Sequence, residues 1–190
     1  MQEAVDPQLR LAMIGEHYRN PRLRGALADA DVVMPGGNPG CGDVVVVYLK
    51  VEGDRLADVR FEGRGCTVSQ AGTSMLLEDV RARDLSLAAV LELDHHHMET
   101  LLGSDVVRAR PRCATLGLAT LKGAVQAYLR RQQALQAGVE VPAATLPPEA
   151  RGLVLGDEVW QAVRDNPAHG DEPLEAAQPP TGGTHGPGER

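Results

Sequence analysis

The sequence predicts one domain that combines helices with an antiparallel β-hairpin over residues 1–138, followed by an acidic extension over residues 139–190. A chain of 190 residues is long enough for one domain with a proper core, and it leaves a remainder. Apolar residues recur at helical and at alternating spacing within the first part. The second part holds nine acidic and three basic residues and eight of the thirteen prolines.

A helix is expected over residues 7–19, followed by a short strand at 31–34. Asp6 followed by Pro7 is typical of a helix start, because the side chain caps the first turn and proline needs no N–H there. Asn20-Pro21 then ends the helix.

The next stretch predicts a loop and then a hairpin. Residues 35–42 contain so many glycines and prolines that we expect neither helix nor strand there. A β-branched run over 44–51, a turn, and an alternating run over 56–62 predict two antiparallel strands. The alternation indicates a hairpin with one solvent-exposed face.

Three helical stretches are expected after the hairpin. The first runs from about residue 67 or 69 to 81, and the second begins near 84 or 86, with an interruption at 93–97. The last begins between 111 and 114 and continues to Gly138, a natural helix terminator. In the extension, we expect a short helix around 156–163 and a disordered end over 178–190.

The charge pattern excludes several classes of partner. The formal net charge is −7, aromatic residues make up 3%, and no block of lysine or arginine is present, which argues against nucleic acid as a partner. No apolar run has the length of a membrane span, and the N-terminus is polar and acidic. The sequence therefore predicts a cytoplasmic protein that does not bind membranes.

The three cysteines stand at boundaries between loops and regular elements. Cys41 lies in the glycine-rich loop, while Cys66 and Cys113 precede or begin predicted helices. Their odd number and a reducing compartment favour free thiols. Any one of them alone could be an inert buried residue. Three together favour metal or sulfur chemistry, because helix N-termini stabilise thiolates.

Specific motifs surround these cysteines. They are residues 37–43 (Gly-Asn-Pro-Gly-Cys-Gly-Asp), 63–71 (Gly-Arg-Gly-Cys-Thr-Val-Ser-Gln-Ala) and 110–116 (Arg-Pro-Arg-Cys-Ala-Thr-Leu), with His-Tyr-Arg-Asn-Pro-Arg at 17–22. Over residues 9–129 this pattern resembles the SufU/IscU family of iron–sulfur cluster assembly proteins, which is NifU N-terminal-like. The resemblance implies an α+β fold, in which a small antiparallel three-stranded sheet is covered by helices.

The resemblance also implies a metal site. Its ligands would be Cys41, Asp43, Cys66 and Cys113, binding Zn²⁺ or, alternatively, iron or a [2Fe-2S] cluster. We expect Cys41 to be the catalytic thiolate that leaves the metal and accepts persulfide sulfur, because it lies in the loop richest in glycine. Arg110 matches a family arginine near the site, and stabilisation of thiolate charge is weighed against a merely solvated side chain.

Two branches of the family remain open. Members of the IscU kind carry a histidine before the third cysteine and a Leu-Pro-Pro-Val-Lys motif upstream, whereas this chain has Arg112 and lacks that motif. Both features favour the SufU kind, in which zinc-bound cysteines relay sulfur from a cysteine desulfurase (SufS-like) to a downstream scaffold (SufBCD-like) or to apo-proteins. The 47-residue interval before Cys113 is short for that branch.

Two further alternatives are kept. A structural zinc domain used for protein binding would need the same four ligands without sulfur transfer. His95, His96 and His97 could form a tract that delivers or buffers metal. Because adjacent helical residues point in different directions, all three cannot serve one ion, and surface histidines are the favoured interpretation.

Overall fold

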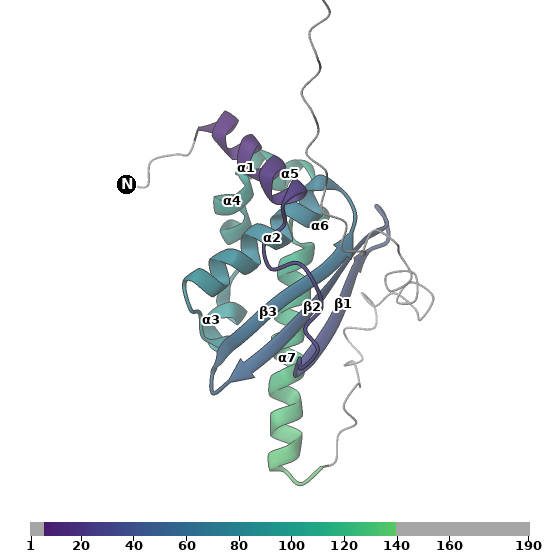
Figure 1. Cartoon of the computed structure of the whole chain (residues 1–190), viewed down its shortest axis with the longest axis vertical. Coiled ribbons are helices and arrows are strands. Elements are labelled where there is room, and N and C mark those ends of the chain that lie inside the picture. The colour runs from purple at the N-terminus through teal and green to yellow at the C-terminus, as the bar shows by residue number, and fades with distance from the viewer. Residues whose placement is uncertain (1–5, 140–190) are drawn as a thin grey trace, which may run out of the picture.

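A three-stranded antiparallel sheet in the order β1-β2-β3 is the frame of the protein, in a computed structural model that describes residues 6–139 (Figure 1). Helices cover the sheet, so the expected α+β class is confirmed. The predicted extension from residue 140 on, with its short helix and its end, lies outside the described residues. The elements are α1 (Pro7–Arg19), β1 (Val32–Asn38), β2 (Asp43–Glu52), β3 (Arg55–Arg64), α2 (Thr67–Ala82), α3 (Leu87–Glu92), α4 (His95–Leu102), α5 (Ser104–Ala109), α6 (Pro111–Ala114) and α7 (Leu116–Gln136).

The first strand continues further than the sequence predicts. Residues 35–38 were expected to be loop, yet they belong to β1 and pair with β2 through residues 43–46. Proline is tolerated here because β1 is an edge strand of the sheet. Only the turn over residues 39–42 remains between the two strands.

The main core lies between the sheet and the helices. Val47 of β2 pairs with Met34 on one side and Phe61 on the other, and all three are fully buried on the same face. Helix α7 packs against β1 and β2, and α2 packs against β3. Figure 1 shows α7 running behind the sheet as the longest helix. Helices α2 and α7, which follow Cys66 and Cys113 in the chain, therefore both pack against the same sheet.

The opposite face of the hairpin is less exposed than the alternation predicts. Val44, Val46 and Tyr48 point to this face and are buried, with Leu27 and Ala30 packed against them from the segment between α1 and β1. The prediction of a solvent-exposed face holds only for part of β3. Strand β2 is therefore apolar at consecutive positions because both of its faces are covered.

Helix α1 is attached to α2 by a buried polar contact. Asp6 caps α1 by accepting a hydrogen bond from the amide of Gln8, as its sequence predicts. Nδ1 of His17 lies 2.9 Å from the hydroxyl of Ser74 on α2, and the same hydroxyl accepts the amide of Arg22 at 2.7 Å. Burial lowers the pKa of His17, so the neutral imidazole is favoured there.

The later helices are broken more often than predicted. The expected interruption at 93–97 is confined to Leu93 and Asp94, between α3 and α4. Helix α5 was not expected, and Thr115 divides the last predicted helix into α6 and α7. These short helices lead the chain from α2 to Cys113. Within the described residues, no helix is long and apolar enough to cross a membrane.

We predict that Gly36→Ala destabilises the protein by about 1–3 kcal/mol, the usual cost of overpacking. A Cβ at this position would lie 2.0 Å from Oγ1 of Thr120 on α7, so α7 would have to move away from β1. Chemical denaturation of purified protein measures the loss. The double variant Gly36→Ala/Thr120→Ala should recover much of it, and equal destabilisation of both variants would contradict the steric explanation.

Candidate metal centre

Four candidate ligands come from three junctions of the fold. Cys41 lies in the turn between β1 and β2, and Asp43 is the first residue of β2. Cys66 is the N-cap residue of α2, directly after β3, and Cys113 belongs to α6. Because Val44 pairs with Arg64 in the hairpin, the turn and the end of β3 meet at one edge of the sheet. Helix α6 packs against α2, which brings the third segment to this edge.

The donor atoms of these residues are close together. Cys41, Asp43 and Cys113 each offer a donor, and the three donors lie within 4.8 Å of one another. The Sγ atoms of Cys41 and Cys113 are 3.6 Å apart. Sγ of Cys66 lies 3.4 Å from Oδ2 of Asp43, so the fourth residue approaches the group through the carboxylate. All three cysteines are free thiols.

Asp43 occupies the centre of the group. Its side chain is almost fully buried, and Oδ1 accepts a hydrogen bond of 2.9 Å from the amide of Cys66. Gly65 makes this contact possible, since a Cβ there would lie 2.6 Å from Oδ1 and the residue has a φ of +154°. A buried carboxylate needs such donors or a cation to offset its lost hydration.

Cys113 is the buried thiol of the group. Burial raises its pKa above the ordinary value for cysteine, and hydrogen bonds with Asp43, Cys41 and Cys66 raise it further. In the absence of a cation, this position therefore favours the protonated thiol. A metal ion would reverse that preference, because a coordinated thiol loses its proton.

Asn38 also contacts the group, although the cysteine motifs by themselves do not predict this. It is the last residue of β1, it is buried, and its side-chain amide donates to Sγ of Cys113 at 3.6 Å. The backbone carbonyl of Asn38 also accepts the backbone amides of Cys41 at 3.0 Å and Gly42 at 2.9 Å. In the sequence, only its place in the first cysteine motif indicates that Asn38 lies near the site. The direction of its side-chain amide depends on the pairing of β1 with β2.

The exposure of the cysteines differs sharply. Cys41 is exposed in its turn, Cys66 is intermediate and Cys113 is buried. Gly42 has a φ of +67°, which lets the chain turn directly from Cys41 into β2. A partner molecule would therefore reach Cys41 before the other two thiols.

Arg110 is close to Cys113 in the sequence, but within the described residues its side chain is not hydrogen-bonded to the group. It is the N-cap residue of α6 and is exposed, and it makes no side-chain hydrogen bond or ion pair with any residue between 6 and 139. Stabilisation of thiolate charge by Arg110 therefore stays a prediction.

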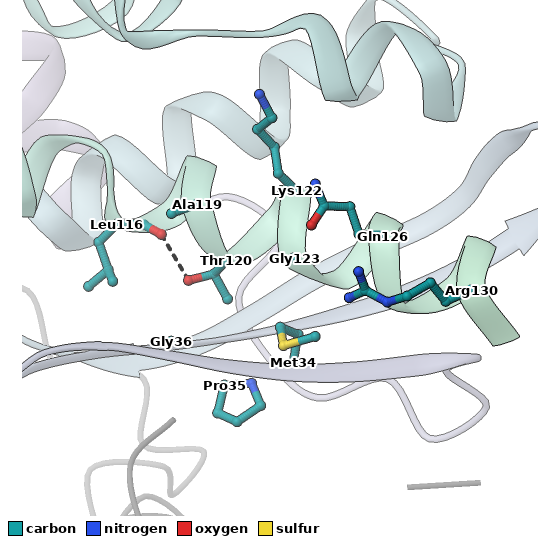
Figure 2. Close-up of a pocket in the computed structure, with 10 residues that line it drawn as sticks. All are labelled: Met34, Pro35, Gly36, Leu116, Ala119, Thr120, Lys122, Gly123, Gln126 and Arg130. Atoms are coloured by element: carbon teal, nitrogen blue, oxygen red, sulfur yellow. Dashed lines mark hydrogen bonds between the residues drawn. The ribbon is translucent and has the colours of Figure 1, made fainter. Parts of the chain in front are cut away.

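A separate cavity lies between β1 and α7 (Figure 2). It has a volume of about 280 Å³, and Met34, Gly36, Gln126 and Arg130 are among its lining residues. Thr120 also lines it, and its hydroxyl donates to the carbonyl of Leu116 on the same helix at 2.8 Å. None of the four candidate ligands lines this cavity.

Comparison with known proteins agrees with the cysteine motifs. The family model for the NifU-like N terminal domain matches residues 11–135. The zinc-dependent sulfurtransferase SufU of Bacillus subtilis is 33% identical over 128 residues, covering 60% of this chain and 86% of SufU. The iron–sulfur cluster assembly scaffold protein IscU of Aquifex aeolicus is 36% identical over 129 residues, covering 67% and 80%.

A solved structure supports the same fold. The crystal structure of a hypothetical protein is 27% identical and matches with a TM-score of 0.54, covering 63% of this chain and 98% of that chain. The family model spans well over half of the present chain, and its range includes all three cysteine motifs and every strand of the sheet. The chain therefore belongs to the family of NifU-like N-terminal domains, together with SufU and IscU proteins of iron–sulfur cluster assembly.

Proposed function

We propose that the protein accepts persulfide sulfur from a cysteine desulfurase at a zinc-bound site and relays it to iron–sulfur cluster assembly. The observation that carries this proposal is the convergence of three thiols and one carboxylate at one edge of the sheet. The ligands would be Cys41, Asp43, Cys66 and Cys113. The similarity to a zinc-dependent sulfurtransferase supports the same assignment.

The spacing of the donors fits a tetrahedral ion. With Zn–S bonds of about 2.3 Å, two thiolates on a tetrahedron are about 3.8 Å apart, and a thiolate and a carboxylate oxygen about 3.6 Å. The corresponding separations are 3.6 Å between Cys41 and Cys113 and 3.4 Å between Cys66 and Asp43. These two pairs need little movement to accept the ion, whereas Cys66 is not among the donors that all lie within 4.8 Å of one another, so its thiol would have to move closer. Bound Zn²⁺ would keep the cysteines as thiolates at neutral pH.

Cys41 is the acceptor in this proposal because it is the exposed thiol of the group. Its thiolate would attack the terminal sulfur of the persulfide on the desulfurase. A new S–S bond forms at Sγ of Cys41 while the S–S bond of the donor breaks, and the donor cysteine leaves as a thiolate. The step is an exchange without net oxidation, so no further oxidant or reductant is required.

The remaining residues hold the acceptor in place. Asp43 fixes the amide of Cys66, and Asn38 donates to Cys113 while its carbonyl holds the turn that carries Cys41. These groups belong to strands and helix ends, which restrict their movement. The exposed turn is left as the part that meets the sulfur donor.

The partners and the compartment follow from this chemistry. A SufS-like desulfurase would supply the sulfur, and a SufBCD-like scaffold or apo-proteins would receive it. The reaction needs reduced thiols, and a cytoplasmic location would keep them reduced. The three free cysteines agree with such a location.

A second candidate is assembly of a [2Fe-2S] cluster on the same residues. Its support is the similarity to the Aquifex scaffold protein, and thiolates are the usual ligands of such clusters. Against it stands Arg112, which occupies the position before Cys113 where the IscU kind has histidine. A structural zinc site is the third candidate.

We predict that the transferred sulfur is found on Cys41. After incubation of the protein with a desulfurase and cysteine, peptide mass spectrometry should find 32 Da added to Cys41, the mass of one sulfur atom. Cys41→Ser should abolish the transfer. Sulfur located on Cys113 alone, in protein that retains its metal, would reject this assignment.

We predict that Asp43→Ala weakens zinc retention and stimulation of the desulfurase together. Loss of a ligand should reduce metal affinity by at least about tenfold, which is the lower end of the effect of an outer-shell change. A chelator competition and a desulfurase assay measure the two effects. Intact stimulation would favour a structural zinc site, and a stable visible chromophore after anaerobic reconstitution, transferable to an apo-protein, would favour the scaffold.

We predict that Gly65→Ala also releases zinc more readily, whereas Gly40→Ala does not. The first substitution places a methyl group against Oδ1 of Asp43, while the nearest atom to a Cβ at Gly40 is Oδ1 of Asn38 at 3.6 Å. Both glycines adjoin a candidate cysteine ligand, so the pair is a matched control. Equal metal loss from both variants in the chelator assay would contradict a specific role for Asp43.

A further inference from the structure

Three consecutive residues at the start of α4 bring possible metal ligands together. They are Asp94, His95 and His96, and one ligand atom of each lies within 4.8 Å of the other two. All three side chains are exposed. The ring centroids of the two histidines are 3.9 Å apart. None of these residues belongs to the cysteine motifs.

His96 and His97 are held by different carboxylates. Nδ1 of His96 lies 3.1 Å from Oε2 of Glu99, and this leaves its Nε2 for a ligand. A carboxylate that accepts from one ring nitrogen is the usual outer-shell partner of a metal-binding histidine, because it fixes the ring and raises its basicity. His97 instead places Nε2 3.0 Å from Oδ2 of Asp79 on α2.

This arrangement refines the expectation from the sequence. Three adjacent histidines indeed do not face one ion, because His97 turns to α2. His95 and His96 nevertheless lie side by side, since they occupy the first turn of α4, where Asp94 is the N-cap. The sequence pattern could not separate the pair from the third histidine without the position of α2.

The local charge favours a cation. Oδ1 of Asp94 accepts the amides of His96 at 3.0 Å and His97 at 3.3 Å, which holds this carboxylate at the start of α4. Glu99 adds a second carboxylate next to His96. The two negative charges oppose the positive end of the α4 dipole, which would otherwise repel an ion.

We propose that Asp94, His95 and His96 form a second metal site, for a borderline divalent ion such as Zn²⁺, separate from the cysteine centre. Nitrogen donors on a tetrahedral zinc ion are about 3.4 Å apart, so these exposed side chains, which have donors within 4.8 Å of one another, would rotate to close around the ion. Imidazole and carboxylate suit Zn²⁺, Cu²⁺ and Ni²⁺, whereas the cysteine centre offers mostly thiolates. Three protein ligands leave a position for water, and the ion exchanges with solvent.

The test uses the full chain and Zn²⁺ alone. Protein that already holds one equivalent of zinc is titrated with more zinc by calorimetry, and the stoichiometry and affinity of the second event are measured. His95→Ala and His96→Ala should each weaken the second event by about tenfold or more, at least the effect of losing an outer-shell partner. Asp94→Asn should weaken it while helix α4 stays capped, since asparagine caps as well as aspartate does.

His97→Ala is the matched control, because it removes a neighbouring imidazole that faces Asp79. It should leave the affinity of the second event unchanged within about twofold, the scatter expected between such measurements. A missing second event, or one that survives in the His95→Ala/His96→Ala double variant, would overturn the proposal. Persistence in that variant would assign the ion to other residues, such as His169 or His185.

The result is independent of the proposed sulfur relay. Asp43→Ala should change the first binding event and leave the second one intact, whereas the histidine variants should do the opposite. Loss of both events from either single substitution would show that the two sets of ligands do not act separately, and it would reject a second site.

Discussion

The buried carboxylate of Asp43 is the contact on which the arrangement of the candidate centre depends. Oδ1 accepts the amide of Cys66, and Oδ2 faces its thiol, so one side chain joins the start of β2 to the start of α2. A carboxylate with almost no exposure is costly unless donors or a cation offset its charge. The amide and the thiol of Cys66 supply such donors, and Gly65 leaves room for them to approach the carboxylate.

Helices and strands carry most of the residues around this contact, and the turn with Cys41 lies outside them. Helix α7 reaches β1 because Gly36 carries no side chain, and α6 ends directly before α7, which fixes Cys113 at the edge of the sheet. Cys41 alone lies in an exposed turn. The proposed function, which combines a bound metal ion with access for a partner, would benefit from this division, because rigid elements position ligands more precisely than loops do.

The two groups of candidate ligands differ in chemistry as well as place. At the sheet edge, thiols and a buried carboxylate favour a tightly held, thiolate-rich site. At the start of α4, His95 and His96 are exposed, and His96 pairs with the carboxylate of Glu99. Binding and exchange are therefore expected to differ, since burial and ligand softness set how strongly an ion is held.

The sequence by itself determined the family, the hairpin, helix α1 with its cap, and the identity of the candidate ligands, because these depend on local patterns and specific motifs. Tertiary structure decided what long-range packing controls. It extended β1 through Pro35, which an edge strand tolerates, and placed Asn38 against Cys113, 75 residues away. It also exposed Cys41 and buried Cys113, since burial depends on which elements meet rather than on neighbouring residues.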